Sequence, residues 1–239
     1  MNLTLITLKV TRYSDTQSIL SGFSREWGRV SLALPAGSGK SAIRMRALTM
    51  PFGIVECVTE RRPGREILPI RQVRQLLPLT SLHSNPLKQM VAMFLSEVLA
   101  AVLQDTQGDE HLFDFIAESI RLLDTADGRA TANFHIYFLY HLGRMLGIEP
   151  DTSTHASGYI LDLADGIWRP SIPLHRRFLP PAESSAAFML SRMTSRNLNA
   201  YRYTREERNR ILDQLLEYFS IHYVSLRGLH SLDILRSML

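Results

Sequence analysis

The spacing of apolar residues changes once along this chain of 239 residues, close to Pro78. Before that point, short apolar runs alternate with polar residues at a period of two, which is typical of β-strands. After it, apolar residues recur every three or four positions, which is typical of amphipathic helices. Because the two periods belong to different elements, the sequence predicts a β domain over residues 1–78 and a helical domain over residues 79–239.

The first domain is predicted to hold five strands. Their ranges are 3–10, 16–23, 28–34, 48–59 and 65–74. Turn residues separate them, and Arg62-Pro63-Gly64 predicts that the last two strands form a hairpin. Five antiparallel strands are too few to bury both faces of an open sheet. A small closed or partly closed barrel of the oligonucleotide-binding type (OB-fold) is therefore predicted, which makes the chain a multi-domain α+β protein.

The second domain is predicted to be all-α from its caps and apolar stripes. Asn85 can cap a helix that opens with Pro86, and Thr204 begins a capping box ahead of a later helix. Another helix, which ends at Gly147, is apolar almost all round and is expected to be the buried centre of the domain. Residues 150–180 show no clear period and are expected to form a long irregular connection.

Charge is unevenly distributed along the chain, although the formal net charge is only +4. Residues 1–80 hold 12 basic and 5 acidic side chains, whereas residues 81–170 hold 5 basic and 12 acidic ones. A basic module joined to an acidic one predicts that the first part meets phosphate groups. The alternative is that surface charge simply varies between the two domains.

Composition and motifs argue against several classes of protein. A single cysteine, Cys57, cannot form an internal disulfide or a zinc site of several cysteines. The N-terminus lacks the pattern of a secretion signal, and no apolar run approaches the roughly 18 residues of a membrane helix. The histidines show no ligand spacing, and no nucleophile motif is present. We therefore expect a cytoplasmic, non-catalytic protein without a metal ion or cofactor.

One motif favours a different function. Gly37-Ser38-Gly39-Lys40-Ser41 resembles the end of the phosphate-binding loop of nucleotide hydrolases. That loop needs a glycine five positions before Gly39, where this chain has Leu34, and it must lead into a helix. The residues after the motif are predicted to break at Pro51 and to continue as a strand, which argues against nucleotide hydrolysis. A helix that begins at Lys40 would favour it.

Basic and aromatic residues of the barrel are the candidates for nucleic-acid binding. Small and basic residues after the third strand predict a mobile loop that follows a nucleic-acid backbone without reading sequence. The candidates for backbone contact are Arg12, Arg25, Arg29, Lys40, Arg44 and Arg46. Arg71 and Arg74 rank second, because the last strand has the alternative role of stiffening the domain junction. Trp27 is a candidate for base stacking, with packing in the core as the alternative, and Phe23 and Phe52 are predicted core residues.

Several short motifs are informative through their order and spacing. They are Tyr13–Leu20, Phe23–Arg29, Ala36-Gly37, Lys40-Ser41, Leu48–Phe52, Phe138–Gly147 and Leu229–Leu232. Together they resemble the RecO family of bacterial recombination mediators, and the resemblance covers nearly the whole chain. The proline of Leu48–Phe52 is shifted from its place in the family, and His230 replaces a lysine of the C-terminal motif.

The resemblance implies a non-catalytic protein of DNA repair that acts in the bacterial cytoplasm, at the nucleoid. It implies binding of single-stranded and double-stranded DNA, annealing of complementary strands and, with the partner RecR, help in loading RecA on DNA coated by single-strand binding protein. It also implies that the helical domain docks the acidic, apolar tail of single-strand binding protein. Lys88, Arg144 and Arg202 are the candidate cations for that tail.

The chain departs from many members of the family at the place of their zinc site. Many family members carry a four-cysteine zinc site after the central helix, but Pro150–Pro170 holds no cysteine, so no zinc is expected. The competing hypothesis for the whole chain is a protein-interaction adaptor whose barrel contacts protein rather than DNA. Binding through phosphates should weaken by orders of magnitude as salt rises, whereas adaptor binding should hardly change.

Overall fold

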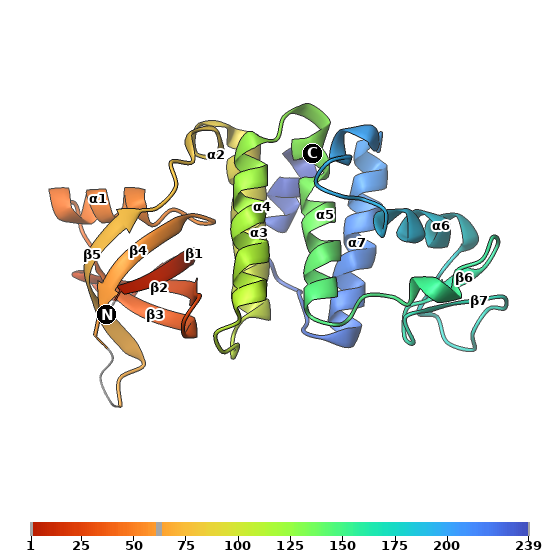
Figure 1. Cartoon of the computed structure of the whole chain (residues 1–239), viewed down its shortest axis with the longest axis horizontal. Helices are drawn as coiled ribbons and strands as arrows, with labels where there is room; N and C mark the ends of the chain where they lie inside the picture. The colour runs from red at the N-terminus through yellow and green to blue at the C-terminus, as the bar shows by residue number, and fades with distance from the viewer. Residues whose placement is uncertain (1, 61–63, 239) are drawn as a thin grey trace. The chain divides into compact units, whose positions relative to one another are not determined.

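The computed structural model describes residues 2–60 and 64–238, which fall into two compact units (Figure 1). The first unit comprises Met1–Thr125 and Leu229–Leu235. The second comprises Ala126–Gly228 and Arg236–Leu239. The first unit therefore contains the first five strands together with the helices that directly follow them in the chain.

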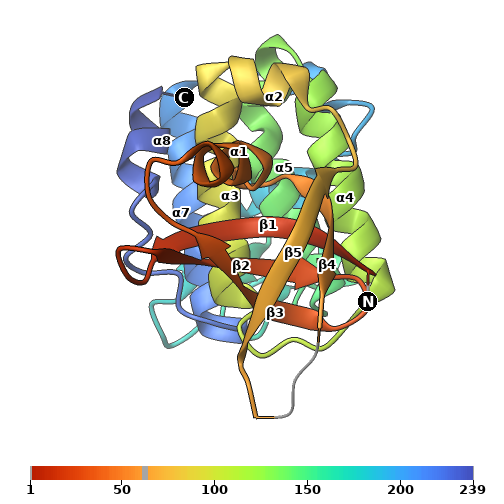
Figure 2. The same ribbon diagram turned by 90° about the vertical axis from the view of Figure 1, so that its left-hand side faces the viewer.

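The first unit contains a closed barrel of five strands, seen from two sides in Figures 1 and 2. Its strands are β1 (Asn2–Arg12), β2 (Gln17–Ser24), β3 (Gly28–Pro35), β4 (Ile54–Thr59) and β5 (Ile67–Gln75). Around the barrel they follow the order β1-β2-β3-β5-β4, and β1 pairs with β4 to close it. Among the barrel pairings of the residues that the structure describes, only that of β3 with β5 is parallel. The predicted five-stranded barrel is confirmed, while Arg62 and Pro63 of the predicted hairpin turn lie outside the described residues.

Apolar side chains from alternate strand positions fill the barrel. On β3, Val30, Leu32 and Leu34 are buried and their neighbours are partly exposed. They pack with Leu20 and Cys57 in one apolar cluster. Burial raises the pKa of the Cys57 thiol to about 11, because an apolar interior disfavours the charged thiolate. The alternation that predicted the strands thus also identifies the residues of the core.

A helix, α1 (Lys40–Leu48), stands where a loop and the start of the fourth strand were predicted. The predicted strand 48–59 was wrong at its beginning, because β4 starts at Ile54. Within α1, Ala42 is buried and Met45 and Leu48 are half-buried. This spacing of three residues places one helical stripe against the barrel.

The helices α2 (Thr80–Ser84), α3 (Pro86–Val102) and α4 (Glu110–Thr125) complete the main part of the first unit. Asn85 caps α3 as predicted, because its side-chain oxygen accepts hydrogen bonds from the backbone N–H groups of Leu87 and Lys88. α3 contacts β1, and α2 contacts both α3 and α4. α3 and α4 therefore bury apolar side chains partly against the barrel.

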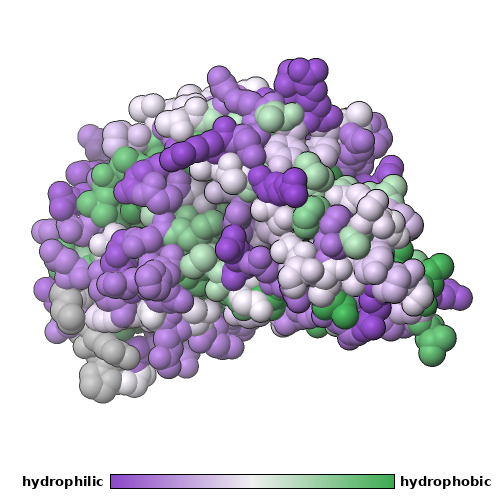
Figure 3. All heavy atoms as spheres, turned by 45° about the vertical axis from the view of Figure 1, so that its right-hand side comes forward, coloured by the Kyte–Doolittle hydropathy of each residue, from purple (hydrophilic) through white to green (hydrophobic). Residues whose placement is uncertain are grey.

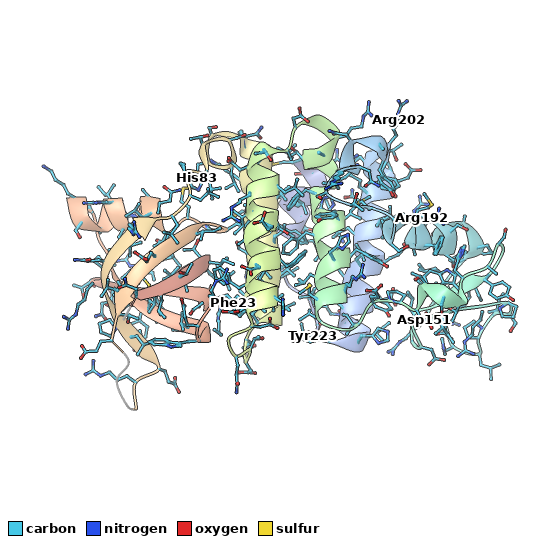
Figure 4. All side chains as sticks on the ribbon, viewed as in Figure 1. Phe23, His83, Asp151, Arg192, Arg202 and Tyr223 are labelled. Carbon is cyan, nitrogen blue, oxygen red and sulfur yellow. The ribbon has the colours of Figure 1, made fainter. Side chains whose placement is uncertain are left out.

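The chain leading into α4 covers the barrel beside β2 and β3. Phe23, labelled in Figure 4, is fully buried, and its ring stacks on that of Phe113 with 6.3 Å between the centroids. Gly28, at φ +73°, lies directly against this segment. A Cβ atom added to Gly28 would stand 2.2 Å from the carbonyl oxygen of Thr106. Phe23 and Phe52 are both buried as predicted, although α4, rather than the barrel interior, covers Phe23.

The second unit is built around α5 (Gly128–Met145), α6 (Pro181–Leu190) and α7 (Arg205–His222), with short 3-10 helices at Thr152–Thr154 and Leu198–Ala200. Eleven of the 18 residues of α5 are buried, which agrees with its predicted place at the centre of the helical region. α5 contacts α7, and Thr204 and Glu207 form the predicted capping box at the start of α7. The last helix, α8 (Leu232–Met238), has residues in both units.

A three-stranded sheet lies in the second unit, where an irregular connection was predicted. β6 (Ile160–Asp162) pairs on one side with β7 (Ile167–Arg169) and on the other with β8 (Phe178–Leu179). Leu161, Trp168 and Leu179 belong to the apolar cluster on which the sheet rests. The helical region is therefore not all-α, because strands of two or three residues are too short to produce a recognisable period.

Asp162 holds this small sheet together. Its carboxylate, 1% exposed, accepts hydrogen bonds from the backbone N–H groups of Ala164 and Asp165. It also lies 3.1 Å from Nε of Arg169 and 3.3 Å from Nε2 of His175. A buried carboxylate needs several such partners, and here they join both ends of the β7–β8 connection to β6.

Candidate nucleic-acid interface

Exposed arginines of the barrel gather in a groove between α1 and the β4–β5 pair. The groove has a volume of about 410 Å³, and its polar lining comes from Ser41, Arg44, Glu56, Arg71, Gln72 and Arg74. Figure 2 shows α1 and β5 on the near side of the barrel, with α3 and α4 behind it. The helices of this unit therefore leave the groove open to a ligand.

An irregularity in β5 places several polar side chains on the outer face of the barrel. Glu56 pairs with Arg74 and Val58 with Gln72, but Thr59 pairs with Ile70. Arg71 is therefore the extra residue of a bulge. Arg71, Gln72 and Arg74 are all exposed, whereas a regular strand would turn alternate residues inward.

Two of the groove arginines are held by carboxylates at the surface. Nε of Arg74 lies 2.6 Å from Glu56, and Nη2 of Arg71 lies 3.1 Å from Glu60. The hydrogen bond from Arg74 lowers the pKa of Glu56 and raises the pKa of Arg74. Ion pairs at the surface are screened by water and contribute little to stability, so a phosphate group can displace the carboxylate.

Arg44 and Lys40 extend the basic surface along α1. Both are exposed, and neither forms an ion pair with another residue of the described ranges 2–60 and 64–238. Arg46 turns away from the groove, because its Nη1 donates a hydrogen bond to the carbonyl oxygen of Gly37 at 2.7 Å. Arg44 is therefore the arginine of α1 that lines the groove.

The start of α1 bears on the phosphate-binding motif of nucleotide hydrolases. The helix begins at Lys40 after Gly39, without a side-chain cap and without an acidic residue in its first turn. This meets the helical condition of the motif, contrary to the loop that was predicted at this position. The glycine condition is not met, because its position holds Leu34. This leucine is 3% exposed and belongs to the barrel core. The uncapped backbone N–H groups remain suited to a phosphate of any ligand.

The other predicted contact residues do not join this groove. Arg12 lies in an exposed ion pair with Asp15 at 2.8 Å. Arg25 forms an ion pair with Asp114, and its guanidinium carbon lies 4.8 Å from the centre of the Phe113 ring. These two arginines have protein partners at separate places on the unit.

Trp27 and Arg29 lie with Arg25 on the covered side of the barrel. Trp27 is partly buried and packs against the apolar cluster of the barrel. Arg29 donates a hydrogen bond from Nη2 to Ser21 at 2.9 Å, and burial lowers its pKa. The structure therefore brings together the second-rank candidates Arg71 and Arg74 with Arg44. One sequence signal could have ranked Arg71 and Arg74 higher. Arg71 and Gln72 are consecutive polar residues, and they interrupt the alternation of apolar and polar residues in β5.

The candidate cations for a partner's tail have different surroundings. Lys88 is 3% exposed, and its Nζ donates hydrogen bonds to Ser81 and to the carbonyl oxygen of Asp124, so it is a structural residue. Arg144 lies 3.1 Å from Glu149 in an ion pair. Arg202, labelled in Figure 4, is exposed. Of the three, Arg202 is the one that is exposed and forms no ion pair with the residues that the structure describes.

The described part of the chain holds neither a cluster of metal ligands nor a membrane-spanning helix. Within it, no group of three His, Cys, Asp or Glu side chains is arranged to hold a metal ion. None of its helices is both long and apolar enough to cross a bilayer.

Comparison with known proteins gives matches along nearly the whole chain. Residues 1–78 match the family model "Recombination protein O N terminal", and residues 83–233 match "Recombination protein O C terminal". The chain is 37% identical to the DNA repair protein RecO of Porphyromonas gingivalis W83, over 98% of this chain and 96% of the relative. It is 31% identical to the protein of the same name from Phocaeicola vulgatus and 30% to that from Bacteroides fragilis, with the same coverage.

Proposed function

The chain belongs to the RecO family of DNA repair proteins, and on that premise we propose that its barrel binds single-stranded and double-stranded DNA in the groove between α1 and β5. Bound DNA strands are annealed there, and with RecR the protein helps RecA to load on DNA coated by single-strand binding protein. It works by binding rather than by catalysis, in the bacterial cytoplasm at the nucleoid.

The observation that carries the proposal is the grouping of Arg44, Arg71 and Arg74 around one open groove. Cationic side chains bind phosphate by releasing condensed counterions, which gives affinity without sequence preference. Ser41 and Gln72 add hydrogen-bond donors for phosphate and sugar oxygens. Such a surface suits a protein that must bind any damaged region of a chromosome.

Annealing follows from the same chemistry. Two complementary strands repel each other through their phosphates, and a basic surface that neutralises some of these phosphates lowers that repulsion. The groove contacts backbone groups and leaves the base edges of a strand free to pair. The charge of the first unit, rather than a catalytic residue, would therefore raise the annealing rate.

The proposed docking of an acidic, apolar tail has a suitable surface in the second unit. The guanidinium carbon of Arg192 lies 5.1 Å from the centre of the Phe188 ring, and Met189 beside it is 43% exposed. Tyr201 donates a hydrogen bond from its hydroxyl to the carbonyl oxygen of Met189, so the residue before Arg202 lies against this apolar surface. Arg192 and Arg202 are both labelled in Figure 4. Apolar surface beside a cation is what a carboxylate-bearing tail requires.

The first test is fluorescence-anisotropy binding to a labelled dT oligomer and to a duplex of equal length across a salt series. The variant R44A/R71A/R74A removes the groove cations, and R196A/R210A/R227A removes the same charge from exposed positions outside the barrel. For single strands, the slope of log affinity against log salt should become shallower by about 2 in the groove variant, at roughly 0.7 per lost phosphate contact. The control variant should keep the slope of the unaltered protein.

The outcomes separate the competing hypotheses. Equal slopes in the two variants would remove the groove from the DNA site. Weak binding with little salt dependence in the unaltered protein would favour the adaptor hypothesis, in which the barrel contacts protein. Single-turnover annealing of complementary oligonucleotides then tests the second part of the proposal, because the groove variant should slow it and the control variant should not.

A further inference from the structure

The loop between β7 and β8 exposes two large apolar side chains at its tip. Ile172 is 70% exposed and Leu174 is fully exposed, at 109% of the reference area, with Pro173 between them. Apolar, green side chains also stand out at the lower right of the molecular surface in Figure 3. Burying such side chains in a partner removes apolar surface from water, so their exposure indicates a binding role.

The loop is anchored at both ends rather than loosely attached. On the β7 side, Arg169 forms ion pairs with Asp162 and Asp165. On the β8 side, His175 lies 3.3 Å from Asp162, and the carbonyl oxygen of Arg177 accepts a hydrogen bond from the backbone N–H of Leu163. Fixed ends hold the apolar tip away from the sheet and lower the entropy that binding must remove.

Cations flank the tip, and the acidic groups near it are already paired. Arg176 and Arg177 are exposed and take part in no ion pair with the residues that the structure describes. Asp162 and Asp165 are held by Arg169 at the base of the loop. The tip therefore combines a narrow apolar point with positive charge, which is complementary to an anionic ligand.

We propose that the 170–177 loop is a wedge that inserts Ile172 and Leu174 against the last base pair where a DNA duplex meets a single strand, while Arg176 and Arg177 bind the flanking phosphates. Apolar side chains next to arginines are used in this way to unstack bases. A terminal base pair has only one stacked neighbour and so costs least to open. This inference rests on the proposed DNA-binding function and adds a preferred DNA structure to it.

The test uses a DNA with a duplex-to-single-strand junction that carries 2-aminopurine at the last base pair, because this base brightens when it is unstacked. The full-length protein should raise its fluorescence and bind the junction more tightly than a dT oligomer. The variant I172S/L174S should abolish the fluorescence increase and weaken junction binding about tenfold. Its affinity for the dT oligomer should change by less than about twofold, since the substitutions are at the surface.

Two comparisons make the result specific. The control M145S/Y223S replaces two other exposed apolar residues of the second unit and should leave the 2-aminopurine signal unchanged. The variant R176A/R177A should weaken junction binding and make its salt dependence shallower. If I172S/L174S keeps the fluorescence increase, the wedge proposal is wrong and the groove proposal stands. The same conclusion follows if the variant loses only the binding of an acidic protein partner. If the unaltered protein binds neither DNA, both proposals fail.

Discussion

His135 is a buried group whose charge state links the stability of the chain to pH. It lies on α5, is 1% exposed, and has its pKa lowered to about 3 by burial and then by the positive charge of Arg208. In the unfolded chain its pKa is about 6.5. The unfolded state therefore binds a proton below pH 6.5 that the folded state does not, so stability is present above pH 6.5 and is lost as the pH falls toward 3.

We expect His135→Gln to flatten this dependence, whatever its effect at neutral pH. Between pH 6 and 4.5 the unfolding free energy of the unaltered protein should fall faster than that of the variant, by about 1.4 kcal/mol per pH unit. Urea unfolding at several pH values measures the difference. His111→Gln, at an exposed position of α4, is the control and should follow the unaltered protein. Parallel curves for His135→Gln would show that another group controls acid unfolding.

Whether an arginine is available to DNA is decided by partners that lie far away in the chain. Arg25 meets Asp114, which is 89 residues further on, and no local pattern announces that pair. Arg44 and Arg74 come from different elements, and only the folding of α1 beside β5 places them in one groove. The sequence identified the basic module and named every arginine of the groove, but it ranked them by local context alone.

At the scale of elements, α1 was missed, because a mobile basic loop was predicted at Lys40–Arg46 and a strand from residue 48. Ile43-Arg44-Met45-Arg46-Ala47 alternates apolar and basic residues, which is typical of a strand. Ile43 is nevertheless 53% exposed, and the residues that face the barrel are Ala42, Met45 and Leu48. Their spacing is helical, and it is visible only once the position of the barrel is known. The longer strands and the capped helices were predicted because period and caps agree there.

The start of α1 leads to a prediction about nucleotides. Lys40→Ala should weaken binding of the dT oligomer a few-fold and make its salt slope shallower by about 0.7, as expected for one lost phosphate contact. The unaltered protein should release no more phosphate from ATP than a buffer blank, because Leu34 occupies the position that the hydrolase motif reserves for glycine. ATP hydrolysis that Lys40→Ala removes would contradict this and favour a nucleotide hydrolase.

At the scale of the whole molecule, the first unit extends beyond the barrel. The change in period predicted a domain boundary at residue 78. That residues 1–78 fold independently stays a prediction. The first unit reaches Thr125 and also includes Leu229–Leu235, where Ser231 donates hydrogen bonds to Glu97 on α3. A barrel cut at residue 78 would expose Phe23, which α4 otherwise covers.

We therefore expect two fragments of the first unit to behave differently. A fragment of residues 1–78 should unfold at lower urea concentration than one of residues 1–125, since uncovering a single buried phenylalanine costs roughly 1.5–3 kcal/mol. It should also bind the dye ANS, which reports exposed apolar surface. Unfolding by circular dichroism compares the two. Equal midpoints would show that the barrel folds independently of α3 and α4.

The burial of Cys57 in the barrel has a practical consequence for following these events. It is the chain's single cysteine, and a thiol that is 1% exposed reacts slowly with maleimides in the folded protein. A cysteine introduced at the exposed positions Ser41 or Leu174 would therefore be labelled selectively, without removing the natural one. An environment-sensitive fluorophore at the first position would test the proposed binding of a strand in the groove, and one at the second would test the proposed insertion of the loop.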